Sequence, residues 1–460
     1  MNGPARPPGP KLPIVGALIM PGRDPLAIFT RFARDYGDIV QFNLSGERAF
    51  FINHPDYIRQ VLVTDTAKYG KSRALERARK LLGDGLLTSD GAVHQRQRRH
   101  LQPAFHRAQI AGYADTMVEH AIRTTSRWAD GATIDVSIEM MRLTLSIVGR
   151  TLFDVDVESK ADRVGRALTG VLETFWLTLL PFSDLVEALP LRAVRTAVAA
   201  RKDLDALIYE MVADRRRHPD AARMDLLSML VRSESDQAGD GLSDGEIRDE
   251  ALTLLLAGHE TTANALMWTW YLLSQSPDVA AAVHDEVDRV LGGNRATADV
   301  TETLPCVTRV VTESLRLFPP AWSIGRRAKE PCVIGGYTIP ARSLVFMSQW
   351  TMHRDARFYA EPGRFMPERW TREFRSSLPR YAYFPFGGGP RHCIGESFAW
   401  MELVLIVATI AQRWELELAP GHPVATQPLL TLRSRHGMRM TPRARVSPIG
   451  DVVSERLSSG

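Results

Sequence analysis

Residues 384–399 of the chain read FPFGGGPRHCIGESFA, a stretch with one cysteine directly after a run of three glycines, a proline, an arginine and a histidine. Its three glycines allow backbone conformations that other residues rarely adopt. Cys393 follows them, just before an apolar run that predicts a helix, where the helix dipole and free N–H groups would stabilise a thiolate. Such a cysteine suits a nucleophile or the axial ligand of a haem iron. A buried, inert cysteine would not explain the glycine run.

The two kinds of nucleophile that fit this position lack parts of their pattern. His392 and Cys393 begin the H-C-x5-R pattern of a phosphatase, but its arginine would stand at position 399, where the chain has Ala399. For any other nucleophile, no histidine or aspartate partner can be assigned from the sequence. Patterns elsewhere in the chain are therefore needed to distinguish a nucleophile from a haem ligand.

The composition is that of a globular protein with a large core. The chain has 460 residues, 45% hydrophobic and 24% charged, with a net charge of +4 and a pI of about 9.0. It contains no long block of Lys and Arg, which argues against nucleic acid as a partner. The three cysteines, Cys306, Cys332 and Cys393, do not make a disulfide framework, so we expect a reducing, cytoplasmic location.

One folded domain is predicted over residues 1–445. An apolar stretch near its N-terminus is broken by Pro13 and Gly16, whereas a membrane span needs about 20 apolar residues. We therefore expect no membrane span, and no signal peptide because a small-residue cleavage site is missing. Residues 1–22 are predicted to be a proline-rich lead-in, and residues 446–460 a flexible polar tail.

A long buried helix is predicted within residues 242–277. Ser243 and Glu246 form a capping box at its start, and nothing interrupts the helical pattern for about 31 residues. The apolar centre of the helix carries Glu260 and Thr261, and buried polar groups need partners. Such a pair, directly after Gly258 and His259 and with the glycine expected to open space, suits a proton relay beside a ligand. The alternatives are a satisfied polar patch or a threonine hydroxyl bonded to a carbonyl one turn earlier.

Two later stretches carry further patterns. VTESLRLFPP at 311–320 places Glu313 and Arg316 on one face of a short helix that ends before the prolines. Alone, such a pair is typical of a solvated surface, but Arg369 in the downstream segment FMPERW would close a three-member network. Residues 332–350 alternate and contain turn glycines, which predicts extended structure.

Together, these stretches resemble the cytochrome P-450 family of haem-thiolate monooxygenases. Residues 386–395 are similar to its cysteine signature F-x-x-G-x-R-x-C-x-G, and AGHETT at 257–262 to its oxygen-activation motif A-G-x-[DE]-T-[TS]. ESLR at 313–316 is similar to its E-x-x-R motif, and FMPERW at 365–370 to its P-E-R-F segment. The motifs follow one another in the family's order, and the resemblance covers residues 7–445.

The resemblance implies a soluble, bacterial-type member with a mainly α-helical, triangular fold and a small β region. Haem b would lie between the long central helix and the helix after the cysteine loop, with Cys393 as the axial ligand of the iron. Glu260 and Thr261 would be the acid–alcohol pair that supports proton delivery during oxygen activation. The E-x-x-R pair and Arg369 would hold the cysteine side of the fold together.

The resemblance also implies which residues contact the haem, whose two propionates require fixed cations. Arg391 and Arg326 match such positions, although the adjacent Arg327 leaves the register open. His94 and Arg98 stand where many members have W-x-x-x-R. Besides the thiolate ligand, the residues expected to contact the haem are His94, Arg98, Arg326, Arg391, Phe386, Gly387 and Ala257.

The implied reaction inserts one atom of dioxygen into a lipophilic molecule such as a fatty acid or a terpenoid. Residues 173–182 are expected in a mobile roof over the substrate. The side chains expected to line the pocket are Leu254, Ala257, Ala321, Trp322, Ile324 and Leu430. A haem-thiolate sensor and a peroxide-driven haem enzyme are the alternatives, and the intact acid–alcohol pair favours neither.

Electrons for this reaction would come from outside the chain. The sequence has no Gly-rich dinucleotide fingerprint and no cysteine set for an iron–sulfur cluster. We therefore expect a separate ferredoxin or flavodoxin, with a reductase that draws on NAD(P)H. It would dock on a basic face near Cys393.

Overall fold

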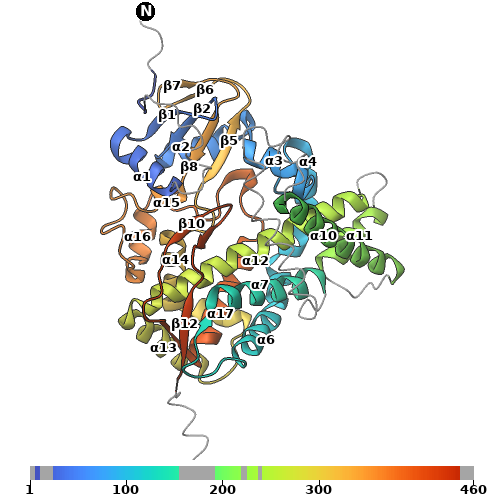
Figure 1. The fold of residues 1–460 in the computed structure, drawn as a ribbon, viewed down its shortest axis with the longest axis vertical. Helices are drawn as coiled ribbons and strands as arrows, with labels where there is room; N and C mark the ends of the chain where they lie inside the picture. The colour runs from blue at the N-terminus through green and yellow to red at the C-terminus, as the bar shows by residue number, and fades with distance from the viewer. Residues whose placement is uncertain (1–5, 11–23, 155–191, 219–224, 237–240, 446–460) are drawn as a thin grey trace, which may run out of the picture.

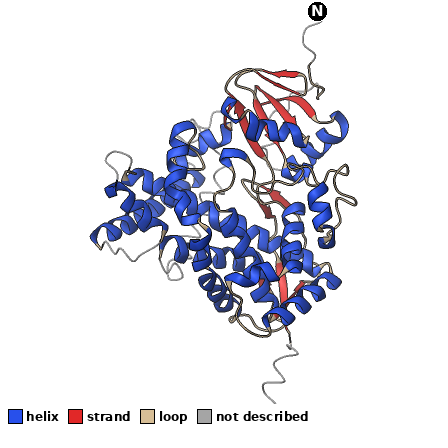
Figure 2. Cartoon of the chain, turned by 180° about the vertical axis from the view of Figure 1, so that it is seen from behind, coloured by secondary structure: helices blue, strands red, loops and turns tan. Residues whose placement is uncertain are grey.

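The computed structural model describes residues 6–10, 24–154, 192–218, 225–236 and 241–445. The expected roof at 173–182, the tail at 446–460 and most of the lead-in therefore lie outside the described residues. Helices make up most of the described chain, and most of the strands gather at one end (Figure 2). This is the mainly α-helical class with a small β region that the sequence predicts.

Helices and strands alternate irregularly along the chain. The helices are α1 (Pro25–Tyr36), α2 (Pro55–Arg59), α3 (Arg73–Leu82), α4 (Gly91–Leu101), α5 (Arg107–Gly112), α6 (Ala114–Thr125), α7 (Val136–Phe153), α10 (Arg192–Arg217), α11 (Leu226–Asp236), α12 (Asp244–Ser274), α13 (Pro277–Leu291), α14 (Pro305–Leu317), α15 (Gln349–Met352), α16 (Arg372–Ser377) and α17 (Glu396–Ala411). The strands are β1 (Ile39–Leu44), β2 (Glu47–Ile52), β3 (Tyr69–Lys71), β4 (Ile134–Asp135), β5 (Ile324–Ala328), β6 (Cys332–Ile334), β7 (Tyr337–Ile339), β8 (Leu344–Met347), β9 (Trp414–Leu418), β10 (Thr426–Pro428), β11 (Leu432–Ser434) and β12 (Arg439–Ala444).

A five-stranded sheet forms one corner of a three-cornered outline, with α10 and α11 at the second corner and α13 near the third (Figure 1). The strand order is β1-β2-β8-β5-β3, and β2 and β8 are its parallel pair. The segment 332–350 forms β6, β7 and β8, as its alternation predicts. Within the described residues, no helix is both long enough and apolar enough to cross a membrane.

The predicted long helix is α12, and it crosses the centre of the molecule (Figure 1). It has 31 residues, and the capping box of Ser243 and Glu246 is present in both directions. Buried residues lie on all sides of α12, which is the pattern of a helix inside a large core. The sequence therefore predicts both the bounds of this helix and its burial.

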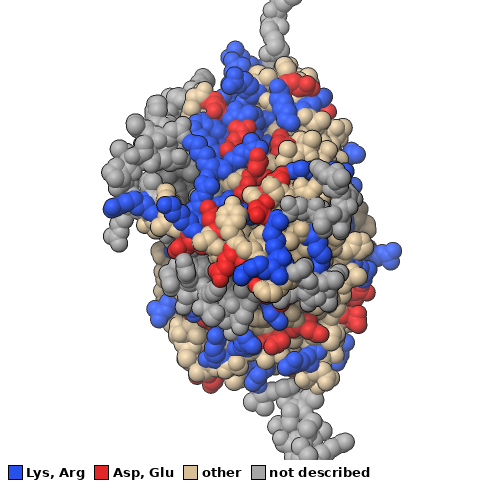
Figure 3. Space-filling model, turned by 90° about the vertical axis from the view of Figure 1, so that its right-hand side faces the viewer, with Lys and Arg blue, Asp and Glu red and all other residues tan. Residues whose placement is uncertain are grey.

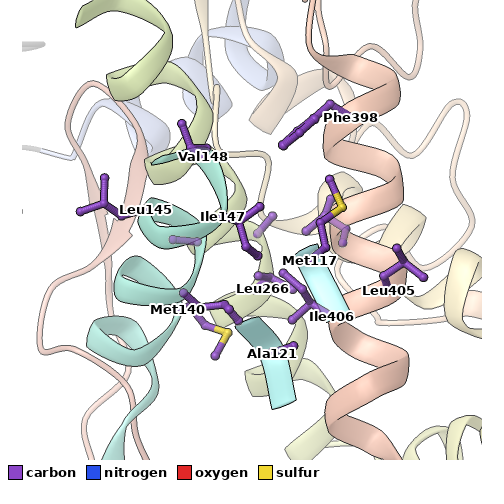
Figure 4. Close-up of a cluster of buried hydrophobic side chains, with 14 of the residues drawn as sticks. Met117, Ala121, Met140, Leu145, Ile147, Val148, Leu266, Phe398, Leu405 and Ile406 are labelled. Atoms are coloured by element: carbon purple, nitrogen blue, oxygen red, sulfur yellow. The ribbon is translucent and has the colours of Figure 1, made fainter. Parts of the chain in front are cut away.

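Helix α17 begins directly after the cysteine loop and packs against α6 and α12. Figure 4 shows Ile406 of α17 in one apolar cluster with Met117 of α6, Ile147 of α7 and Leu266 of α12. These four side chains are completely or almost completely buried. Since protein cores are close-packed, this cluster fixes the start of α17, and with it the cysteine loop, relative to α12.

Glu313 and Arg316 of α14 are buried rather than solvated, unlike most such pairs. The Arg316 guanidinium donates to both carboxylate oxygens of Glu313, at 2.7 and 2.8 Å, and neither side chain is exposed. Arg369 donates to Glu313 at 3.0 Å and closes the predicted three-member network. Trp370 Nε1 adds a further bond to the same carboxylate at 2.8 Å.

Candidate active site

The cysteine loop, residues 384–395, contains four glycines, and two of those in its run at 387–389 have a backbone conformation that favours glycine. Gly387 has a φ of 75° and Gly389 a φ of 69°, a region that side chains disfavour. A β-carbon on Gly389 would lie only 1.9 Å from a carbonyl oxygen of the backbone that packs against the loop. The Cys393 N–H donates to the carbonyl of Phe386 at 3.0 Å. The glycine run thus holds the cysteine in place, as expected.

Cys393 is both accessible and strongly desolvated. Its side chain is exposed, yet the surrounding protein raises the pKa of its thiol to about 11, and the Gly395 N–H offsets this only in part. The N–H at the start of α17 favours the thiolate, as expected, but burial outweighs this contribution. A reactive nucleophile needs a lowered pKa, whereas a coordinating metal ion deprotonates a thiol outright. The environment therefore suits a metal ligand better than a nucleophile.

One face of α12 presents accessible residues among buried ones. Ala257 is exposed and Thr261, one turn later, is partly exposed, while the residues between and around them are mostly buried. The Thr261 hydroxyl donates to the carbonyl of Ala257 at 2.8 Å, which is the local bond that the sequence left open. The position of Gly258 suggested that this glycine opens space for a ligand, but the structure shows otherwise. A β-carbon there would lie 3.1 Å from Val148 of α7, so this glycine allows the two helices to approach.

Basic side chains from separate segments converge beside the cysteine loop. Burial lowers the pKa of Lys71 to about 7, and the positive charges of Arg326 and Arg391 lower it further. Burial also lowers the pKa of His94 to about 4, with Lys71 as the next cause. The members of this cationic cluster are Lys71 on β3, Arg98 on α4, Arg326 on β5 and Arg391 in the cysteine loop, and His94 on α4 lies beside them as a neutral side chain.

The described carboxylates do not balance this positive charge. Asp90 pairs with Arg391, and burial raises the pKa of Glu250, which faces Lys71, to about 8. The Nε of Arg326 is buried and has no hydrogen-bond partner in the described part of the chain. Buried cations require anionic partners, so the cationic cluster fits a ligand that carries carboxylates of its own.

The structure resolves which of the two adjacent arginines belongs to the cluster. Arg326 is buried, and nearby Arg391 helps burial to lower its pKa to about 10. Arg327 points to the other face of β5, as alternation along a strand requires, and pairs with Glu47 at 3.3 Å and Glu76 at 3.5 Å. Arg326 is therefore the residue available to a ligand near the cysteine loop.

Comparison with known proteins agrees with this geometry. The family model described as Cytochrome P450 matches residues 7–439. The chain belongs to the cytochrome P450 family. Cyclooctatin synthase of Streptomyces melanosporofaciens is 38% identical over 94% of each chain, and pentalenene oxygenase of Streptomyces avermitilis is 34% identical over 94% of this chain and 96% of its own. The cytochrome P450DA heme domain superposes with a TM-score of 0.86 at 30% identity, over 96% of this chain and 98% of that one.

This P450 is a monooxygenase, and its family implies a haem iron, dioxygen and a redox partner. The described residues fit the haem. Cys393 offers a single accessible thiol, Arg98 donates to the backbone carbonyl beside it at 2.8 Å, and the cationic cluster has the excess charge that two propionates would neutralise. Lys71, His94, Arg98, Arg326 and Arg391 are the residues that would hold the propionates.

Glu260 and Thr261 of this P450 point in different directions. The Glu260 side chain is 1% exposed and turns towards the hairpin of β10 and β11. Its Oε1 accepts from the Thr431 hydroxyl at 2.5 Å and from Arg433 Nε at 2.7 Å. The acid and the alcohol do not hydrogen-bond each other, so any transfer of a proton between them needs an intermediate group or a change of rotamer.

The residues expected to line the substrate pocket lie on three elements of the P450. Leu254 and Ala257 are three residues apart on one face of α12. Ile324 lies near the cysteine loop, since its Cδ1 is 3.4 Å from the position of a β-carbon on Gly387. Leu430 is partly buried in the turn between β10 and β11. Their common role in a pocket stays a prediction.

The two remaining pocket candidates follow the Pro-Pro turn, where Ala321 is partly buried. The ring of Trp322 belongs to another apolar cluster and lies 6.2 Å from the ring of Phe29. Its Nε1 donates to the carbonyl of Leu429 at 2.9 Å. Trp322 therefore braces the C-terminal hairpin from the side of the five-stranded sheet.

Several residues of the site were not found from the sequence. Lys71 is the last residue of the short segment Tyr69-Gly70-Lys71, which directly precedes the N-cap of α3. The sequence around it shows only a lysine after an aromatic and a small residue, and this pattern does not indicate a site. Asp90, Thr431 and Arg433 act through contacts with residues more than 150 positions away. No local pattern marks such contacts.

Proposed function

We propose that this P450 hydroxylates or otherwise oxygenates a terpenoid-like, lipophilic substrate. The observation that carries the proposal is the accessible face of α12, where Ala257 and Thr261 stand among apolar residues and bring an alcohol next to an apolar surface. Two relatives with similarity along nearly the whole chain are named for terpenoid chemistry, pentalenene oxygenase and cyclooctat-9-en-7-ol 5-monooxygenase. A fatty acid is the other lipophilic class that the apolar residues would accept.

In the proposed mechanism, the chain's own residues position the reactants and move protons. When bound, the haem supplies the iron chemistry that cleaves the O–O bond, which a thiolate ligand favours. Cys393 would provide that ligand, and the cationic cluster would hold the propionates. Thr261 presents its hydroxyl oxygen on the accessible face of α12, and Glu260 serves as the acid that resupplies protons from the interior.

We further propose that electrons come from a ferredoxin or flavodoxin, through a reductase that uses NAD(P)H. Lys and Arg side chains gather on the side of the molecule that carries α3 and α4 (Figure 3). Exposed examples are Arg79 on α3 and Arg99 on α4, and Arg98 of α4 bonds the cysteine loop directly. An acidic partner would be attracted to this basic side, close to Cys393. The three cysteines are all free, which supports a cytoplasmic location.

The substrate class is tested by binding and turnover with chosen probes. Pentalenene, cyclooctat-9-en-7-ol and dodecanoic acid are titrated into the haem-loaded protein, and the spin-state shift of the Soret band is recorded. Each is then incubated with a surrogate ferredoxin, its reductase and NADPH under ¹⁸O₂. We expect a terpenoid probe to shift the band and to gain one labelled oxygen. A shift and a labelled product with dodecanoic acid alone would overturn the terpenoid assignment.

A further inference from the structure

The hydrogen bonds of Glu260 single out two residues of the C-terminal hairpin. Thr431 and Arg433 both donate to Oε1, at 2.5 and 2.7 Å. Asn264, one turn further along α12, donates to the Thr431 hydroxyl at 3.1 Å and so orients it. Glu260, Thr431 and Asn264 are buried, and the Arg433 side chain is 17% exposed. The Glu260 carboxylate is thus held by the Thr431 hydroxyl, which Asn264 orients, and by the positive charge of Arg433.

The hairpin that carries these donors is itself held from both sides. The carbonyl of Leu429 accepts from Trp322 Nε1 at 2.9 Å. The carbonyl of Leu432 accepts from Trp268 Nε1 of α12 at 3.0 Å, and its N–H donates to the carbonyl of Pro320 at 2.9 Å. Thr431 lies between these fixed points. Its hydroxyl therefore has little freedom to move away from Glu260.

A second buried carboxylate in the same chain shows what a purely structural one looks like. Both oxygens of Glu313 are saturated: Oε1 accepts from Arg316, Arg369 and the Met366 N–H, and Oε2 accepts from Arg316 and Trp370. Both bonds to Glu260 reach the same oxygen. Within the described residues, no hydrogen bond reaches its Oε2. Glu260 is anchored on one side only.

We propose that Thr431 and Arg433 are positioning residues that hold Oε1 of Glu260 and leave Oε2 as the oxygen that exchanges protons. Arg433 offsets the burial of the carboxylate charge, and Thr431 fixes the plane of the carboxylate. This inference rests on the proposed relay role of Glu260, and it assigns to the hairpin a part in the reaction that goes beyond lining a pocket.

The test measures proton delivery without a substrate. Haem-loaded protein is supplied with NADPH through a surrogate ferredoxin and reductase, and the rate of NADPH oxidation, the dioxygen consumed and the hydrogen peroxide formed are recorded in H₂O and D₂O. Reduction of dioxygen takes two electrons and two protons to peroxide, and four of each to water. Poor proton delivery therefore slows oxidation, raises the share of peroxide and increases the solvent isotope effect, which a change in stability alone would not do.

Five variants are compared with the wild type. We expect Glu260→Gln to slow oxidation by about 10²-fold, the lower end of the range for a proton-transfer residue. Thr431→Val and Arg433→Gln should each slow it by about tenfold, since a displacement of about 1 Å costs up to 10²-fold, and Arg433→Lys should recover part of the loss. The double variant Glu260→Gln with Arg433→Gln should be no slower than Glu260→Gln.

The control and the outcomes separate the two proposals. Arg443 of β12 forms an exposed ion pair with Glu417 of the neighbouring strand β9. Arg443→Gln removes this pair and should leave the rate of NADPH oxidation, the share of peroxide and the solvent isotope effect unchanged. Normal rates and isotope effects in Thr431→Val and Arg433→Gln, with Glu260→Gln impaired, would overturn the positioning role alone. A normal Glu260→Gln would overturn the relay role, and the positioning role with it. Thr431→Val keeps the buried charge pair, so the test stands even where Arg433→Gln fails to fold.

Discussion

Replacing Glu313 with glutamine should strongly destabilise this P450. The Glu313 side chain is completely buried and accepts five hydrogen bonds, two of them from Arg316 and one from Arg369. The variant keeps the shape of the side chain but removes the negative charge. Two arginines, whose side chains are 0% and 6% exposed, would then lose their shared anion.

The magnitude follows from the geometry. Hydrogen bonds to a charged group are each worth about 1.5–3 kcal/mol, so five would sum to more than 7 kcal/mol, but the amide oxygen of Gln keeps some of them. Breaking a buried ion pair from one side costs about 3–5 kcal/mol. We therefore expect a loss of about 4 kcal/mol, out of a total of about 5–15 kcal/mol for a typical domain.

The assay is urea unfolding of the haem-loaded protein, followed by far-ultraviolet circular dichroism and by the Soret band. A loss of about 4 kcal/mol should lower the midpoint by about 1 M urea, because m is at the upper end of its range for a chain of this size. Glu361→Gln is the matched control, since Glu361 pairs with Arg364 at 3.2 Å on the exposed surface and such pairs contribute about 0–1 kcal/mol. Equal midpoints for the two variants would refute the argument that this buried carboxylate stabilises the fold.

Four further predictions follow from the site. Cys393→Ser should abolish the strongly red-shifted Soret band of the reduced, carbon monoxide-bound protein, and an unchanged band would remove Cys393 as the ligand. Thr261→Ala should raise the peroxide formed per NADPH during turnover of a bound substrate, whereas full coupling would contradict its role. Arg326→Gln should release haem to apomyoglobin faster than Arg327→Gln, because Arg326 is the buried member of the cationic cluster; equal rates would count against this assignment. Burial raises the pKa of Glu402 to about 8, so the wild type should lose stability as pH rises from about 4.5 to 8, and Glu402→Gln should flatten that slope in urea unfolding at pH 5 and pH 8.

Features encoded by contiguous residues could be predicted from the sequence. The bounds of α12 follow from a capping box at one end and a Ser-Pro pair after the other, and all of these signals lie within one helix. The need for glycine in the cysteine loop follows likewise from three adjacent residues. The family and its mainly helical fold could also be inferred, because their motifs are short and their order is fixed.

Features that depend on distant contacts could not be predicted. Glu260 and Glu313 are both helical glutamates within known motifs. The neighbouring residues in the sequence do not reveal that both oxygens of Glu313 accept hydrogen bonds, whereas Glu260 accepts them at a single oxygen. The donors to Glu260 come from positions 171 and 173 residues away. The role of Gly258 was misjudged for the same reason, because Val148 on α7 fills the space that the glycine leaves.

The cationic cluster links the fold to its ligand. Burial lowers the pKa of Lys71 and Arg326, which means that the folded chain disfavours their charged forms. A chain without an anion at this place therefore folds against an electrostatic penalty, and a group with two carboxylates removes it. Because a ligand that binds only the folded state stabilises it, haem should contribute to the stability of the segments that carry these residues. The five side chains that would hold the propionates would then couple β3, α4, β5 and the cysteine loop into one unit around the cofactor.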